Sequence, residues 1–287
     1  MPSSIVTDTN TFSAGKSLKG YLPTLDGWRA VAILAVLLDH GTAELNWIPK
    51  SQYFRTGPNG VSLFFAISGF LICSRLLEEE SVRSRISLKD FYVRRACRIL
   101  PPALAYLVVI GLLGIAGCIL VTPIEWWSCI FFFRNYLPYS EITRGWGGYT
   151  IHYWSLAVEE HFYLLWPALL FLAGRMRARY VASALVISVA IWRWWDFHHQ
   201  VFNKLVPGLL WPSRTDIRLD GLLLGCLAAL LLAEAKNRDW MVRNVPTYIF
   251  AILIFIYALF QIIPGKHLYS VWESMILAIV VAWTVIC

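Results

Sequence analysis

Two ionisable side chains stand eleven positions apart in one apolar run, LDGWRAVAILAVLLDH, over residues 25–40. Eleven residues at about 100° each return to within about 20° of the starting direction, so on a helix Arg29 and His40 share one face, roughly 16 Å apart. Arg29 can pair with Asp26, three residues earlier. His40 is a candidate general base, because histidine alone has an unperturbed pKa near neutrality. Its alternative role is that of an interfacial histidine at the end of a membrane span.

A second group of ionisable residues opens the run WSLAVEEHFYLLWP, over residues 154–167. An ionisable group inside a span costs roughly 2.5–3.5 kcal/mol near the bilayer centre, so its default interpretation is functional. Glu159, Glu160 and His161 are three such groups at the start of one apolar stretch. Glu159 and Tyr163 are i,i+4 neighbours, and we expect both to face the interior of a helix bundle. A carboxylate there can orient a histidine or bind sugar hydroxyls.

Arginines form a third group, in DFYVRRACRILPP over residues 90–102. Arg94, Arg95 and Arg98 precede a Pro-Pro pair that we expect to break the helix. They are either a positive-inside anchor or an anion site for a phosphorylated cytosolic ligand.

A fourth group lies in RTDIRLDGLLLGCLAALL, over residues 214–231. Arg214, Asp216, Arg218 and Asp220 are here either an ion-pair cluster at the outer surface or part of a functional site. Ser68, within SGF, lacks the G-x-S-x-G context of a nucleophile, and a packing notch with Gly69 is the favoured interpretation.

The composition indicates a membrane protein. Of the 287 residues 58% are hydrophobic and 15% charged, against about 45–50% and 25% in soluble domains. The net charge of +7 comes from short basic clusters between apolar runs, which argues against a nucleic-acid partner. The six cysteines show no C-x-x-C pairing, so we expect small core residues, without a disulfide or a metal site.

Windows of about 20 apolar residues can each cross a bilayer as a helix. The sequence therefore predicts an all-α, polytopic helical membrane protein with about eight spans. The predicted spans are 26–45, 58–77, 102–122, 154–174, 180–195, 216–235, 247–263 and 268–287. The stretch 126–140 is too short and polar, and we expect a re-entrant or interfacial segment.

The basic residues predict the orientation. With the N-terminus inside, the inner segments hold 15 Lys and Arg and the outer segments 8, so we expect a multi-pass protein of the cell (inner) membrane with a cytoplasmic N-terminus. Residues 1–21 form a polar tail without a signal peptide, and 22–287 form one transmembrane domain. The chain ends in VVAWTVIC without a polar flank, so we expect further C-terminal spans in the complete protein.

Five motifs occur in the order and spacing of the acyltransferase-3 family, the OafA-type membrane O-acyltransferases, which the chain resembles over residues 22–287. They are LDGWRAVAILAVLLDH, FFAISGFLI, RRACRILPP, WSLAVEEHFYLLWP and RTDIRLDGLLLGCLAAL. The resemblance implies transfer of an acyl group, most often acetyl from acetyl-CoA, to a hydroxyl of an extracytoplasmic glycan, glycolipid or similar acceptor. The partners it implies are the lipid bilayer, acyl-CoA as donor and a carbohydrate or glycolipid acceptor, without a metal.

The resemblance also implies roles for site residues. His40 removes the proton of the acceptor hydroxyl, Glu159 holds the imidazole or the acceptor, and Arg29 stabilises the oxyanion or the pantetheine arm. Arg94, Arg95 and Arg98 bind CoA phosphates. We expect Glu160, Asp216 and Arg214 to bind substrate. Family members often carry Gln at the position of His161, so the role of this residue stays open. Whether the acyl group passes through a covalent acyl-enzyme intermediate also stays open.

Two other functions fit the same residues. A secondary transporter that exports an acylated or glycan species would suit intramembrane Arg, Glu and His equally well. A non-catalytic assembly subunit would use the polar stripe to bind partner helices. Release of CoA thiol separates the enzyme from a carrier, which liberates none. His40→Gln separates it from an assembly subunit, because the subunit would fail to assemble whereas the enzyme would fold but be inactive.

Overall fold

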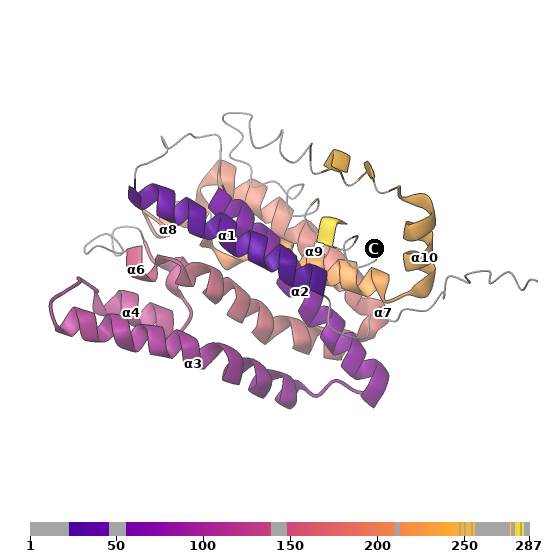
Figure 1. The fold of residues 1–287 in the computed structure, drawn as a ribbon, viewed down its shortest axis with the longest axis horizontal. Coiled ribbons are helices and arrows are strands. Elements are labelled where there is room, and N and C mark those ends of the chain that lie inside the picture. Colours follow the sequence, from indigo (N-terminus) through magenta and orange to yellow (C-terminus); the bar gives the residue numbers. More distant parts are fainter. Residues whose placement is uncertain are drawn as a thin grey trace, which may run out of the picture.

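The protein is helical throughout the part that the structure describes, which confirms the all-α prediction. The structure is a computed structural model that describes residues 23–45, 56–138, 148–209 and 213–246, with short pieces between 248 and 283. Figure 1 shows the arrangement of its helices. They are α1 (Pro23–Leu45), α2 (Thr56–Arg83), α3 (Leu88–Ile115), α4 (Pro123–Ile130), the 3₁₀ turn η1 (Arg134–Tyr136), α6 (Gly148–Ile151), α7 (Tyr153–His199), α8 (Val201–Leu205), α9 (Thr215–Leu232) and α10 (Ala235–Asn244).

Helix α2 lies at the centre of the bundle and packs against α1 and α9, while α9 also packs against α7 (Figure 1). Two glycines let α2 and α9 approach closely. A Cβ added to Gly69 would lie 2.0 Å from the carbonyl oxygen of Leu222, and one added to Gly225 would lie 2.2 Å from that of Ala66. The small-residue notch predicted at Ser68-Gly69 is therefore a helix-crossing point.

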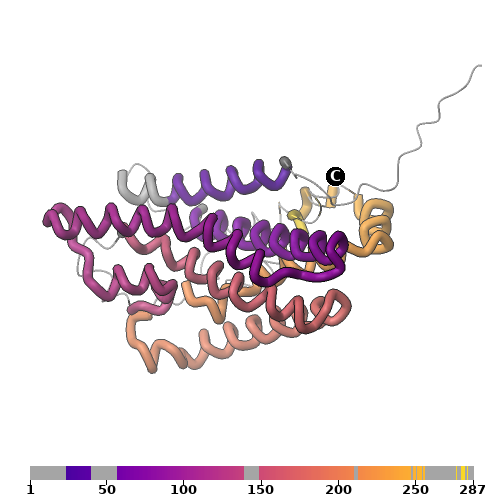
Figure 2. Tube along the Cα trace, turned by 90° about the horizontal axis from the view of Figure 1, so that it is seen from below, coloured from indigo at the N-terminus to yellow at the C-terminus, as the bar shows by residue number. Residues whose placement is uncertain are grey.

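Helix α7 is folded back on itself, and its two halves run in opposite directions (Figures 1 and 2). The bend is at Gly174, whose φ of 70° and ψ of 160° suit glycine and few other residues. His161 from the first half and Trp192 from the second half both reach the start of α9, where they contact Thr215 and Asp216. The two halves correspond to the spans predicted at 154–174 and 180–195.

The predicted break at the Pro-Pro pair is wrong, because α3 continues through Pro101 and Pro102. Since proline removes a backbone donor, the helix there loses internal hydrogen bonds, and tyrosines tie this region to the rest of the bundle. The Tyr153 hydroxyl donates to the Ala103 carbonyl at 2.7 Å, and the Tyr92 hydroxyl donates to that of Leu164 at 2.8 Å.

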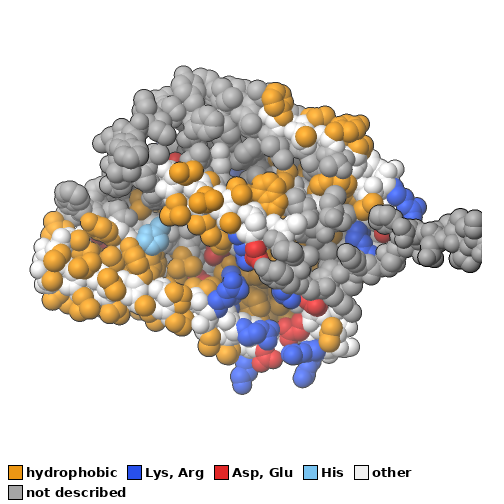
Figure 3. All heavy atoms as spheres, viewed as in Figure 1, with side chains coloured by type: hydrophobic (Ala, Val, Ile, Leu, Met, Phe, Trp, Pro, Cys, Tyr) orange, Lys and Arg blue, Asp and Glu red, His pale blue; other side chains and the backbone are white. Residues whose placement is uncertain are grey.

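The outer surface of the bundle is largely apolar. The most apolar window of α3 is only 11% buried, against 72% for that of α2. In Figure 3 apolar side chains cover α3 and α4, while charged ones gather where α2 passes into α3. An exposed apolar helix face of this size suits a bilayer.

By length and composition, three described helices can cross a membrane: Gly57–Arg83, Leu88–Ile115 and Tyr149–His199, the last holding both halves of α7. The predicted spans 26–45 and 216–235 coincide with α1 and α9, which carry several charged residues. The spans predicted at 247–263 and 268–287 lie mostly outside the described residues, so the number eight stays a prediction. Helix α4, which overlaps the start of the predicted interfacial stretch 126–140, has eight residues, about 12 Å and too short to cross.

Candidate active site

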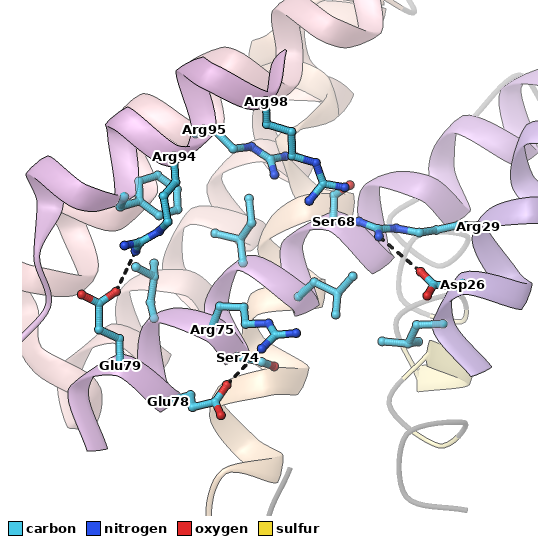
Figure 4. A pocket seen from close by; sticks show the side chains of 15 residues that line it. Asp26, Arg29, Ser68, Ser74, Arg75, Glu78, Glu79, Arg94, Arg95 and Arg98 are labelled. Atoms are coloured by element: carbon cyan, nitrogen blue, oxygen red, sulfur yellow. Dashed lines mark hydrogen bonds and ion pairs between the residues drawn. The ribbon is translucent and has the colours of Figure 1, made fainter. Parts of the chain in front are cut away.

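A cavity of about 610 Å³ lies between α1, α2 and α3 (Figure 4). Five arginines and three carboxylates line it, so the wall has an excess of positive charge. The arginines are Arg29 from α1, Arg75 from α2, and Arg94, Arg95 and Arg98 from α3; the carboxylates are Asp26, Glu78 and Glu79. The structure thus brings together four arginines that the sequence predicted in two separate stretches.

Three of these arginines form ion pairs within the cavity wall (Figure 4). Arg29 is 3.6 Å from Asp26, and Arg75 is 3.4 Å from Glu78. Arg94 donates to Glu79 at 3.0 Å. These pairs are partly exposed, so each contributes only about 0–1 kcal/mol to stability, and their side chains can exchange partners with an anionic ligand at little cost.

The mouth of the cavity extends along the connection between α2 and α3. A second cavity of about 270 Å³ shares Arg75, Glu78, Glu79 and Arg94 with the first and adds Arg83. Glu79 also accepts from the backbone N–H of Ser87, at 3.2 Å, at the start of α3. Arg75 and Arg94 therefore lie toward the point where α2 turns into α3, which we call the α2–α3 end.

The deep end of the cavity adjoins buried polar groups of α7. Ser68 lines the cavity, and Arg95, also on the cavity wall, acts electrostatically on the Glu159 side chain. Glu159 is only 7% exposed, and its Oε1 has no hydrogen-bond partner in the described structure. The guanidinium carbon of Arg95 lies 3.8 Å from the centre of the Tyr163 ring.

His40 belongs to α1, as predicted, but its side chain lies outside the described residues. Its position on the helix places it eleven residues from Arg29, nearer the end of α1 that is remote from the cavity. Its role as a general base stays a prediction.

Arg214 and Asp216 lie at the start of α9. In Figure 1 the end of the bundle with α8 and the start of α9 is opposite to the connection between α2 and α3, and we call it the α8–α9 end. Arg214 is 1% exposed and donates to Asp196 at 2.6 Å and also to Asp216. Asp216 accepts further from Trp192 at 2.6 Å and from Tyr136 at 3.3 Å. Both residues thus take part in a buried network that joins α7, η1 and α9, and their predicted part in substrate binding is not tested.

His161 joins the same network. Its Nδ1 lies 2.7 Å from the Thr215 hydroxyl, which also accepts from the Asn135 side chain at 2.7 Å. His161 therefore connects α7 to α9 at the α8–α9 end and lies apart from the arginine-lined cavity.

Sequence reasoning missed Arg75, which was counted only among the inner positive charges. A signal was present: Ser68 and Arg75 are seven residues apart, two helical turns, and so share a face of α2. Within the described residues, no group of three or more His, Cys, Asp or Glu is arranged to hold a metal ion.

The fold and the site together define a class of protein. It is a helical bundle suited to a membrane, with an arginine-lined cavity beside a buried carboxylate. The chain belongs to the acyltransferase-3 family: residues 22–287 match the family model described as an acyltransferase domain. This confirms the resemblance seen in the five motifs.

Curated relatives from Staphylococcus aureus agree with this assignment. O-acetyltransferase OatA of strain NCTC 8325 / PS 47 is 33% identical over 223 residues, covering 74% of this chain and 35% of that protein. SACOL0978 of strain COL, a protein named for O-acetyl transfer, is 29% identical over 269 residues, covering 87% of this chain and 42% of its own length. The chain thus spans less than half the length of these relatives. No solved structure matches it.

Proposed function

We propose that the chain is the membrane domain of an O-acetyltransferase that takes acetyl from acetyl-CoA in the arginine-lined cavity and transfers it to a hydroxyl of an extracytoplasmic glycan or glycolipid. The observation that carries this proposal is the convergence of five arginines from three helices on one cavity. Coenzyme A carries three phosphate groups, and guanidinium groups bind phosphate with two parallel hydrogen bonds.

The location of the cavity supports a cytosolic donor. Its mouth is at the α2–α3 end, which belongs to the segment 75–100 that the positive-inside rule assigns to the cytoplasm. Acyl-CoA is made in the cytosol, so its phosphates can bind at this mouth while the thioester extends inward. We expect the thioester to extend toward Ser68, which lines the cavity, and toward the buried Glu159.

In the reaction the acetyl group moves from the sulfur of CoA to the hydroxyl oxygen of the acceptor. The acceptor oxygen attacks the thioester carbonyl, a C–O bond forms, and the C–S bond breaks to release CoA thiolate, which takes up a proton. His40 accepts the proton of the acceptor hydroxyl, and Arg29, directly on the cavity wall, stabilises the oxyanion or the pantetheine arm. Glu159, which is buried beside the cavity, holds the acceptor.

The test uses membranes that contain the full-length protein, labelled acetyl-CoA and an extract of host surface glycans. Label incorporation and free CoA thiol are followed for wild type and for His40→Ala at matched expression. The proposal predicts both products with wild type and a loss of about 10²-fold or more with the variant. Transport of a species without thiol release would instead support a transporter, and an His40→Ala protein that fails to assemble would support a structural subunit.

A further inference from the structure

The three arginines of RRACR do not share one environment. Arg94 and Arg98 are exposed, whereas Arg95 is half-buried and its Nε is fully enclosed without a hydrogen-bond partner. We propose that Arg95 is a positioning residue for the carboxylates of α7, rather than a ligand of CoA phosphates. This inference rests on the proposed function, because it divides the arginine cluster between the phosphate end and the reacting end of one donor.

Arg95 stacks on the aromatic ring of Tyr163. The Arg95 guanidinium lies over the ring, with Cζ 3.8 Å from its centre, well within the roughly 6 Å of a cation–π interaction. One face of the guanidinium is therefore covered, and its N–H groups are directed along its edge. Tyr163 is 1% exposed, so the ring is a fixed platform.

The Tyr163 ring lies beside Glu159 on α7. Tyr163 follows Glu159 by four residues, one helical turn, so the ring and the carboxylate occupy the same face. A guanidinium held on the ring is thereby held beside Glu159. Two cations, Arg95 and Arg29, act electrostatically on Glu159, and the interaction with Arg95 is the larger.

The carboxylates of Glu159 and Glu160 need a counter-charge. Glu159 and Glu160 are adjacent in the chain, repel each other, and each has a buried oxygen without a hydrogen-bond partner in the described structure. Arg95 acts on both carboxylates. A buried carboxylate deprived of its counter-charge is costly, so loss of Arg95 disturbs the position of both.

Arg94 provides the contrast. It is one residue, about 100° of helix, away from Arg95, and it pairs with Glu79 at the cavity mouth instead of α7. Arg85, in the exposed connection between α2 and α3, lines neither cavity and serves as a control of equal chemistry.

The experiment compares Arg95→Met, Arg95→Lys, Arg94→Met and Arg85→Met in the purified full-length protein. Binding of CoA is measured by calorimetry, and turnover at saturating acetyl-CoA by thiol release. We expect Arg94→Met to raise the Kd for CoA about tenfold, the equivalent of one charge-assisted hydrogen bond. Arg95→Met should leave Kd within about threefold and lower kcat at least about 100-fold, with partial recovery in Arg95→Lys. Arg85→Met should match wild type in both.

A second arm measures the interaction of Arg95 with its carboxylate directly, without any donor. The unfolding temperature is determined for Arg95→Met, Glu160→Gln and the double variant. Removing one carboxylate should offset part of the loss caused by Arg95→Met, whereas the effects of Arg94→Met and Glu160→Gln should add.

Two results would overturn the inference: additive effects of Arg95→Met and Glu160→Gln, or a Kd for CoA that rises in Arg95→Met as much as in Arg94→Met with kcat retained. Failure of the proposed function looks different, because wild type itself would then bind no CoA. The coupling arm would still decide whether Arg95 positions the α7 carboxylates.

Discussion

The backbone of Gly69 in α2 is in direct contact with the backbone of Leu222 in α9, since a Cβ added to Gly69 would lie 2.0 Å from the Leu222 carbonyl oxygen. Gly69 follows Ser68, which lines the arginine-lined cavity. The crossing of α2 and α9 therefore fixes the deep end of the site, and the stability of this crossing can be tested separately from the chemistry.

Gly69→Ala should destabilise the protein by about 3 kcal/mol or more, the upper end for overpacking, because the clash is with backbone that cannot rotate away. Gly27→Ala in α1 is the matched control: no atom of the described residues lies within 4 Å of its added Cβ, and alanine in a helix gains up to about 1 kcal/mol over glycine. Unfolding in detergent, followed by tryptophan fluorescence, measures both. Equal unfolding temperatures for the two variants would refute the close crossing.

Arg214→Met should destabilise the bundle by about 3–5 kcal/mol, because Asp196 and Asp216 then lose their buried counter-charge. The Arg214–Asp196 distance is 2.6 Å and both side chains are 1% exposed. Lys204→Met, on an exposed position of α8, is the control and should unfold with wild type. A stable Arg214→Met protein with a raised KM for the acceptor would instead favour the substrate-binding role predicted from the sequence.

Arg75→Met should raise the KM for acetyl-CoA about three- to tenfold, less than a fully buried charge-assisted hydrogen bond would give, because the Arg75 side chain is 61% exposed. Thiol release at varied acetyl-CoA measures the change, with Arg85→Met as control. An unchanged KM would remove Arg75 from the phosphate-binding group.

The cysteines provide a test of orientation and of burial. Burial raises the pKa of the Cys129 thiol to about 12, so at pH 8 it stays protonated and should resist maleimide. Cys118, in the connection between α3 and α4, is exposed. It lies near the outer end of the predicted span 102–122.

In intact cells, an impermeant maleimide should therefore label a variant whose single cysteine is Cys118, but not one whose single cysteine is Cys129. Ser84→Cys, in the connection at the α2–α3 end, should be labelled only after permeabilisation. The reverse pattern for Cys118 and Ser84→Cys would invert the proposed orientation.

How far the sequence predicts the site depends on the range of each interaction. Arg29 could be selected because a charge within an apolar run is costly wherever it lies. The arginines of α3 could be selected because three of them cluster just before a predicted span, where they can bind an anion. Arg75 could not, because it stands among ordinary inner-side charges, and only the packing of α1 and α3 against α2 makes it a cavity residue.

The same distinction holds for the fold. Apolar windows predicted the helices, whereas the prolines of α3 misled because local propensity is overridden by tertiary contacts such as the Tyr153–Ala103 hydrogen bond. Arg214 pairs with Asp196, eighteen residues earlier in the chain and on the other side of α8 in the sequence. No local pattern predicts this pair.

The central claim is that the arginine-lined cavity binds the phosphates of acetyl-CoA. The most direct measurement is a titration of the purified full-length protein in nanodiscs with acetyl-CoA, for wild type, Arg75→Glu/Arg94→Glu and Arg85→Glu. We predict saturable binding to wild type and Arg85→Glu that weakens with salt, and a loss of about 100-fold or more in the double variant. Absence of binding to wild type, or equal binding to all three proteins, would contradict the claim.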